Sequence, residues 1–155
     1  MDITLDQTKK PLEGVSRVLD ALADHHDVVI LDCAPSISLV SENVFTAADQ
    51  LLVPLVPSTL SVRTFEQLQT FLAGGPQPAP GVVAFLSMVD RRRRLHRELA
   101  ESLPETLPGV ARAVIPVASA VELMGVARMP LVVNHPRSPA ARAYAELWAE
   151  VAAGL

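Results

Sequence analysis

Several residue types that build common functional sites are scarce in this sequence of 155 residues. Cys33 is the one cysteine, so neither an internal disulfide framework nor a cysteine zinc cluster can form. No run of about 18 or more apolar residues is present, which excludes a membrane-spanning helix of ordinary length. Residues Met1–Thr4 have neither the basic start nor the apolar core of a signal peptide, and we therefore expect a cytoplasmic protein.

Lysine and glycine are also sparse. Lys9 and Lys10 are the only lysines, and the seven glycines are scattered along the chain. The phosphate-binding patterns G-x-x-x-x-G-K-[ST] and G-x-G-x-x-G are both absent. The sequence as written therefore contains no loop of the kind that cradles nucleotide phosphates.

Apolar residues are plentiful by contrast. Hydrophobic residues make up 50% of the chain and charged residues 19%, a composition typical of a folded domain and not of a disordered one. The length suits a single domain over residues 1–155. The net charge of −4 means that the chain as a whole is no polycation for nucleic acid or anionic membranes.

The hydrophobic pattern alternates between short β-branched runs and helical spacing, which predicts an α/β fold with a mostly parallel sheet flanked by helices. Pro54 lies inside one expected strand and favours an edge or a bulge. The expected strands are Asp27–Asp32, Leu51–Val56, Val82–Met88 and Ala111–Pro116, and the expected helices are Pro11–His26, Ser38–Ala48, Ser61–Leu72, Leu95–Leu103, Ser119–Met124 and Ala140–Ala153.

Asp32 ends the first expected strand and is the sharpest candidate for chemistry. The carboxyl ends of parallel strands border the crevice where α/β sheets bind ligands, and a carboxylate there can hold Mg²⁺ directly or through water. Pro35 and Ser36 follow in a loop that we expect to act as a switch loop. An equally weighted alternative is that Asp32 caps the next helix. A receiver domain ranks low, since no lysine follows position 10.

Five arginines cluster at the start of an expected helix. Arg91, Arg92, Arg94 and Arg97 are candidate DNA-binding residues, since guanidinium groups bind phosphate in a sequence-independent, salt-sensitive way. The alternative is a solvated helix start whose arginines pair with Glu98 and Glu101. No aromatic residues are interleaved to stack on bases.

Several motifs resemble, in order, those of the ParA/MinD-type ATPases with a deviant Walker A motif. The resemblance covers nearly the whole chain from about Leu12. Its motifs are Asp27–Ser36, a helix ending in Ala47-Ala48-Asp49, an apolar segment ending in Pro57, Met88–Leu95 (similar to Met-x-Asp-x-Arg-Thr-x-Leu), Val114–Pro116, Arg128–Leu131, His135–Ser138 and Ala141–Tyr144.

The resemblance implies a P-loop NTPase-like (SIMIBI-type) fold and an ATPase that acts in chromosome partitioning or plasmid segregation. A full-length family member binds Mg²⁺ and ATP and forms a homodimer. It also binds DNA nonspecifically at the nucleoid and interacts with a ParB-like adaptor protein. On this basis Asp32 is the catalytic, metal-side residue, Pro116 lies near the nucleotide, and Arg92 matches an arginine linked with DNA binding.

The chain also departs from the family pattern. The first strand and the loop Lys-Gly-Gly-x-Gly-Lys-[Thr/Ser] are absent, so we expect a partial fold that does not hydrolyse ATP alone. Val117, Ala118 and Ala120 stand where the family has arginine and asparagine. Without the central strand, we expect a dimer or a sheet in which Asp27–Asp32 and Leu51–Val56 meet. The alternative function is a non-catalytic regulatory or interaction module.

Overall fold

A computed structural model describes the chain apart from residues 1–13, 21, 34–38 and 76–77. The chain forms two compact units, which are Met1–Asp49 with Gly74–Pro80 and Gln50–Ala73 with Gly81–Leu155. No helix of the described residues is long and apolar enough to cross a membrane.

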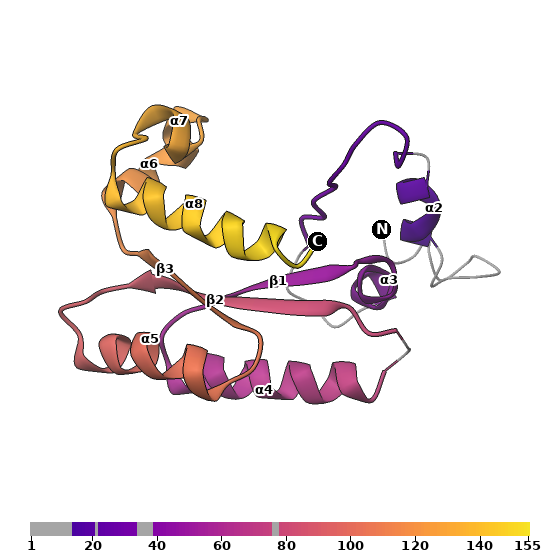
Figure 1. Ribbon diagram of the computed structural model, residues 1–155, viewed down its shortest axis with the longest axis horizontal. Coiled ribbons are helices and arrows are strands. Elements are labelled where there is room, and N and C mark those ends of the chain that lie inside the picture. Colours follow the sequence, from indigo (N-terminus) through magenta and orange to yellow (C-terminus); the bar gives the residue numbers. More distant parts are fainter. Residues whose placement is uncertain (1–13, 21, 34–38, 76–77) are drawn as a thin grey trace. The chain divides into compact units, whose positions relative to one another are not determined.

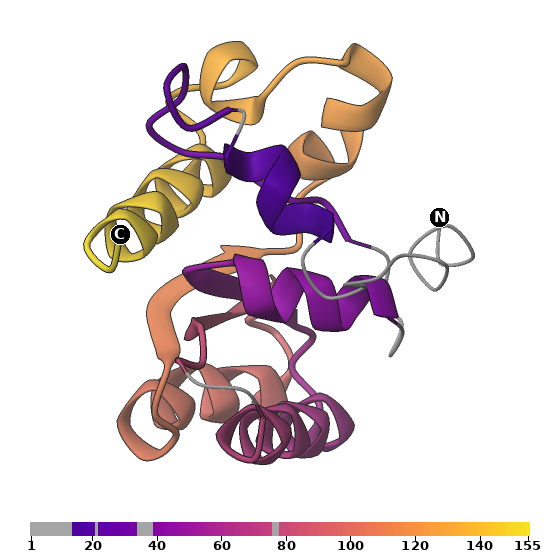
Figure 2. The same cartoon turned by 90° about the vertical axis from the view of Figure 1, so that its right-hand side faces the viewer.

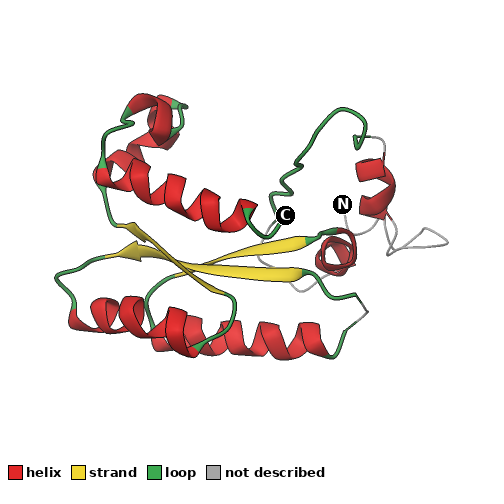
Figure 3. Ribbon diagram, viewed as in Figure 1, coloured by secondary structure: helices red, strands yellow, loops and turns green. Residues whose placement is uncertain are grey.

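The second unit is built on a parallel sheet of three strands in the order β1-β2-β3. The strands are β1 (Gln50–Leu55), β2 (Gly81–Val89) and β3 (Val110–Pro116). Strands and helices alternate along this unit (Figure 3), as the hydrophobic pattern predicts. The α/β fold class, with helices flanking a parallel sheet, is therefore confirmed.

Helices cover both faces of this sheet. Figure 1 shows α4 (Thr59–Ala73) and α5 (Arg94–Thr106) on one face and α8 (Pro139–Ala152) on the other, and Figure 2 shows α4 and α5 side by side. Each face has its own apolar core, because side chains alternate between the two faces of a strand. The core beneath α4 and α5 contains Leu55, Phe65, Ala84, Leu86, Val89 and Leu103, and the core beneath α8 contains Phe85, Ala111, Ala113, Ile115, Ala143, Leu147 and Val151.

Two shorter helices precede α8. The first, α6 (Ser119–Ala127), extends three residues beyond the sequence-based expectation, and α7 (Leu131–Asn134) was not expected. Leu131 of α7 is buried against Ala140 and Ala141 of α8. The start of α8 follows a common helix signal, because Ser138 accepts a hydrogen bond from the Ala141 N–H at 3.1 Å and a proline follows it.

The first unit contains α2 (Gly14–Asp20) and α3 (Leu39–Ala47). Buried Asn43 of α3 accepts a hydrogen bond from the Gly14 N–H at 3.0 Å, which ties the two helices together. The expected helix Pro11–His26 is shorter than predicted, since residues 22–25 form turns and residues 11–13 lie outside the described part.

The expected strand Asp27–Asp32 is wrong. Its described residues form no strand, and Ile30 is 81% exposed. An apolar run becomes a buried strand only if neighbouring strands take its backbone hydrogen bonds, and the described sheet consists of β1, β2 and β3 alone. The expectation that this run pairs with Leu51–Val56 in one sheet is wrong for the same reason.

The two edge strands of the sheet differ. The register of β1 with β2 is regular along the strand, and Pro54 sits at an edge, as expected for a residue without an N–H. On β3 the register shifts: β2 advances from Ala84 to Leu86 while β3 advances from Val110 to Val114. This bulge leaves backbone groups of β3 without a strand partner.

A carboxylate from α8 supplies the missing partner. Glu150 accepts hydrogen bonds from the Arg112 N–H at 2.9 Å and from the Ala113 N–H at 2.7 Å. Both N–H groups belong to the bulged part of β3. The helix that covers this face of the sheet therefore also satisfies the irregular edge strand.

Candidate functional site

The candidate site begins at the carboxyl end of β2, where the strand is bent. Between the pairs Leu86–Val114 and Val89–Pro116, β2 advances by three residues and β3 by two. Met88, in this stretch, has φ of 58°, a left-handed conformation that costs a side-chain-bearing residue about 1–2 kcal/mol. A strained bulge at this point turns the chain out of the sheet and sets the direction of the following loop.

The loop after β2 is closed by Asp90. Its carboxylate accepts hydrogen bonds from the backbone N–H of Arg92 and from Nε and Nη2 of the same residue, each at 3.0 Å. The backbone N–H of Arg93 donates to the Asp90 carbonyl, also at 3.0 Å. The contacts from Arg92 lower the pKa of Asp90 from 3.8 to about 2, so the carboxylate is ionised at neutral pH. Asp90 in turn raises the pKa of Arg92.

Two residues of α5 hold the same loop from the other side. His96, only 3% exposed, accepts the Asp90 backbone N–H at its Nδ1, at 3.0 Å. The neutral imidazole therefore carries its proton on Nε2. Arg97 donates from Nη1 to the Arg91 carbonyl at 2.8 Å and to the Arg92 carbonyl at 3.3 Å. The loop is thus fixed by side chains at both ends of its sequence.

The structure confirms that the arginines gather around one helix start, and it separates them by partner. Arg92 is paired with Asp90, and Arg94 lies 2.6 Å from Glu98 one turn along α5. Arg91 and Arg93 have no side-chain hydrogen bond or ion pair among the described residues. The expected pairing with Glu98 therefore occurs, and it involves Arg94.

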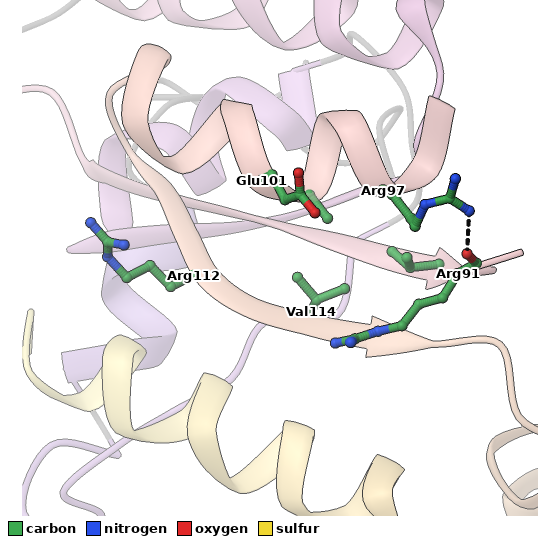
Figure 4. A pocket seen from close by; sticks show the side chains of 7 residues that line it. Arg91, Arg97, Glu101, Arg112 and Val114 are labelled. Carbon is green, nitrogen blue, oxygen red and sulfur yellow. Dashed lines mark hydrogen bonds between the residues drawn. The ribbon is translucent and has the colours of Figure 1, made fainter. Parts of the chain in front are cut away.

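A hollow of about 240 Å³ lies beside the loop, between α5 and β3 (Figure 4). In the close-up, the Arg91 side chain extends along β3 while Arg97 turns toward the Arg91 carbonyl. Arg112, at the opposite end, is held by Glu105 at 2.7 Å. The lining residues are Val89, Arg91, Arg97, Ala100, Glu101, Arg112 and Val114.

The residues expected to bind or sense a nucleotide do not form a site among the described residues. Asp32 is exposed in a segment without regular structure, and Pro35 and Ser36 lie outside the described residues. Pro116 ends β3 opposite Val89, next to residues 90–97, the turn after β2 and the first residues of α5, which we call the arginine loop. In the part of the chain that is described, no three His, Cys, Asp or Glu side chains group as metal ligands. The role of Asp32 in binding Mg²⁺ stays a prediction.

Comparison with known proteins places the chain among relatives. Residues 1–74 match a family described as "AAA domain". Over 146 residues the chain is 27% identical to the sporulation initiation inhibitor protein Soj of Bacillus subtilis (strain 168), with 90% of this chain and 57% of Soj covered. The chromosome partitioning protein ParA of Caulobacter vibrioides (strain NA1000 / CB15N) is 30% identical over 111 residues, covering 66% of this chain and 41% of that protein.

The chain is related to Soj and to proteins of the ParA family. A ParA family protein of Chlamydia pneumoniae adds a further match, 31% identical over 99 residues, with 63% of this chain and 39% of that protein covered. The chain spans about half the length, or less, of these curated relatives. Because the match to Soj covers 90% of the chain, it includes the arginine loop near its middle.

Sequence reasoning found the arginines and missed what organises them. Asp90 and His96 were not singled out as site residues, although an Asp two residues before an Arg at a helix start is a recognisable turn signal. Arg93 was counted in the arginine cluster but not among the candidate DNA-binding residues. The contact between His96 and the Asp90 N–H depends on the turn itself and has no signature in spacing.

Proposed function

We propose that these 155 residues provide DNA contacts for a ParA-type partition function. The observation that carries the proposal is the arginine loop: five arginines between positions 91 and 97 lie at a fixed turn and the helix start that follows it, at the carboxyl edge of a parallel sheet. Ligands of open α/β sheets bind at this edge. The family relationship supports the same role.

Phosphate contacts of this kind are sequence-independent, and they weaken as salt competes for the DNA. We expect the chain to bind duplex DNA of unrelated sequences with similar affinity, measured by fluorescence anisotropy at several salt concentrations. The triple variant Arg91→Ala/Arg92→Ala/Arg94→Ala should lose most of this binding. Equal binding by the triple variant and the wild type would reject the role of the loop.

We also propose that these residues alone do not turn over Mg-ATP. In a full-length relative, Mg²⁺ and ATP bind at a phosphate loop together with an acidic residue such as Asp32. The 155 residues contain no glycine- and lysine-rich phosphate loop, and Asp32 is exposed outside any strand. The residues present therefore do not form a complete binding site for Mg-ATP, and no catalytic step is assigned to them. Phosphate release that requires magnesium and disappears in Asp32→Ala would contradict this proposal.

A second candidate function is protein interaction, either as a homodimer or with a ParB-like adaptor. The observation in its favour is the run Val28–Ile30, whose three apolar side chains are all exposed. Contiguous exposed apolar residues often mark interaction sites. Sedimentation velocity tests this candidate: Ile30→Asp should reduce self-association, whereas Val126→Asp, at a position that is equally 81% exposed, should not. Equal association of both variants would count against this surface.

A further inference from the structure

The five arginines of the loop are not equivalent, because three of them already have partners. Arg92 makes a two-pronged contact with the Asp90 carboxylate, and its own backbone N–H adds a third hydrogen bond to that group. Such planar, bidentate pairs are the strong form of arginine–carboxylate contact. The guanidinium of Arg92 therefore closes the turn.

The next two arginines are also engaged. Arg94 donates from Nε to Glu98 at 2.6 Å, which neutralises its charge locally. Arg97 gives Nη1 to the carbonyls of Arg91 and Arg92, so its side chain acts as a brace beneath the loop. Figure 4 shows this brace and its dashed contact to the Arg91 carbonyl.

Arg91 and Arg93 remain. Their side chains are exposed and have no carboxylate or carbonyl partner among the described residues, while their backbone is held by the Asp90–Arg92 turn and by Arg97. A guanidinium without a partner binds a phosphate without first breaking an ion pair. A fixed backbone also reduces the ordering cost of binding.

We propose that Arg91 and Arg93 are the residues that contact DNA phosphates, and that Arg92, Asp90 and His96 are positioning residues. This inference rests on the proposed DNA binding. It differs from what the family resemblance implies, since that resemblance points to Arg92. It also adds Arg93, which belongs to the arginine cluster but is not among the DNA-binding candidates named from the sequence.

The salt dependence of DNA binding distinguishes a residue that contacts a phosphate from a residue that only positions the loop. In duplex DNA each neutralised phosphate adds about 0.9 to the slope of log affinity against log salt. We expect Arg91→Gln and Arg93→Gln each to lower the slope by about that amount and the affinity by roughly threefold to tenfold at moderate salt. Arg112→Gln removes the same charge at the opposite end of the hollow, where Glu105 already pairs with it, and should leave the slope unchanged.

The positioning pair is tested without changing net charge. The double variant Asp90→Asn/Arg92→Gln removes one charge of each sign and should weaken binding while keeping the wild-type slope. A slope that falls in this variant as it does in Arg91→Gln would show that Arg92 touches phosphate, and would overturn the inference. Unchanged slopes in both Arg91→Gln and Arg93→Gln would overturn it as well.

His96 has a matched pair of substitutions. In His96→Asn the amide oxygen can replace Nδ1 as acceptor for the Asp90 N–H, whereas His96→Leu keeps bulk and offers no acceptor. We expect weaker binding with an unchanged slope in His96→Leu, and recovery in His96→Asn. Equal affinity of the two variants, with both folded by circular dichroism, would remove His96 from the positioning set.

A readout without DNA distinguishes this inference from the proposed function. In ¹⁵N NMR spectra of the free protein, the Arg92 Nε–H should exchange slowly with water, and those of Arg91 and Arg93 rapidly. Added duplex should shift the Arg91 and Arg93 signals and leave Arg92 in place. Absence of binding by the wild type would overturn both proposals, whereas wild-type binding with a large shift at Arg92 alone would overturn only the present one.

Discussion

Each of the two edge strands of the sheet has a side without a neighbouring strand, and the two differ in how the backbone groups on that side are treated. On β3, a bulge interrupts the regular pairing and Glu150 of α8 accepts the two N–H groups that the bulge frees. On β1, pairing with β2 is regular to the end, and Pro54 is the one feature that removes a donor from this edge strand. Bulges and edge prolines both discourage strand addition. On β3, Glu150 already binds two of the edge N–H groups, whereas on β1 Pro54 removes a single donor. The difference teaches that this sheet can be extended at β1 more readily than at β3.

The largest expected effect tests whether the two edge strands are equally anchored in the core. Leu55 of β1 and Ile115 of β3 are 4% and 1% exposed. Leu55→Ala and Ile115→Ala should each lower the free energy of unfolding by about 2–5 kcal/mol, because each leaves a cavity. Chemical denaturation measures this change. Leu52→Ala, at a 49% exposed position of β1, is the control and should cost far less.

A smaller effect is expected where the edges differ. Glu150→Ala removes the acceptor of two backbone N–H groups and should lower the free energy of unfolding by about 1–3 kcal/mol. Glu146→Ala, one turn earlier on α8 and exposed, removes the same charge and should cost little. If both variants unfold at the same denaturant concentration, Glu150 does not protect β3.

A substitution at Pro54 should make the edge strand β1 easier to extend by another strand. Pro54→Val restores a backbone N–H to β1 and replaces proline by a residue that favours strands. We expect this change to alter the free energy of unfolding by no more than about 1 kcal/mol. We expect the clearer change in self-association, which should increase with protein concentration in sedimentation velocity. A variant whose self-association equals that of the wild type at all concentrations would show that β1 is no more extendable than β3.

The smallest expected effect concerns the central strand, whose end is closed by Asp90. The folded-state pKa of Asp90, about 2, lies below its ordinary value of 3.8, so its contribution to stability is present above pH 3.8 and is lost as the pH falls toward 2. The Arg92 amide signal in NMR should report this loosening over that range. Asp90→Asn should show no such transition, and an identical acid transition in this variant would assign the change to another carboxylate.

Most elements of the second unit follow from local pattern. The expected strands Val82–Met88 and Ala111–Pro116 lie within one residue of β2 and β3 at each end, because short apolar runs are typical of strands that helices bury on both faces. Asp27–Asp32 has an equally apolar pattern and forms no strand, since a strand also needs partners that pattern does not reveal. The bulges were equally hidden, because they arise from register between strands.

The sequence by itself determined the alternation of strands and helices, the concentration of arginines at positions 91–97, and the relationship to ParA-type proteins. Tertiary structure alone decided which of these arginines are paired, that His96 and Arg97 brace their loop, and that Glu150 satisfies one edge of the sheet. The physical reason is range. Hydrophobic periodicity is read within a dozen residues, whereas hydrogen bonds between a helix and a strand 38 residues away exist only after the chain has folded.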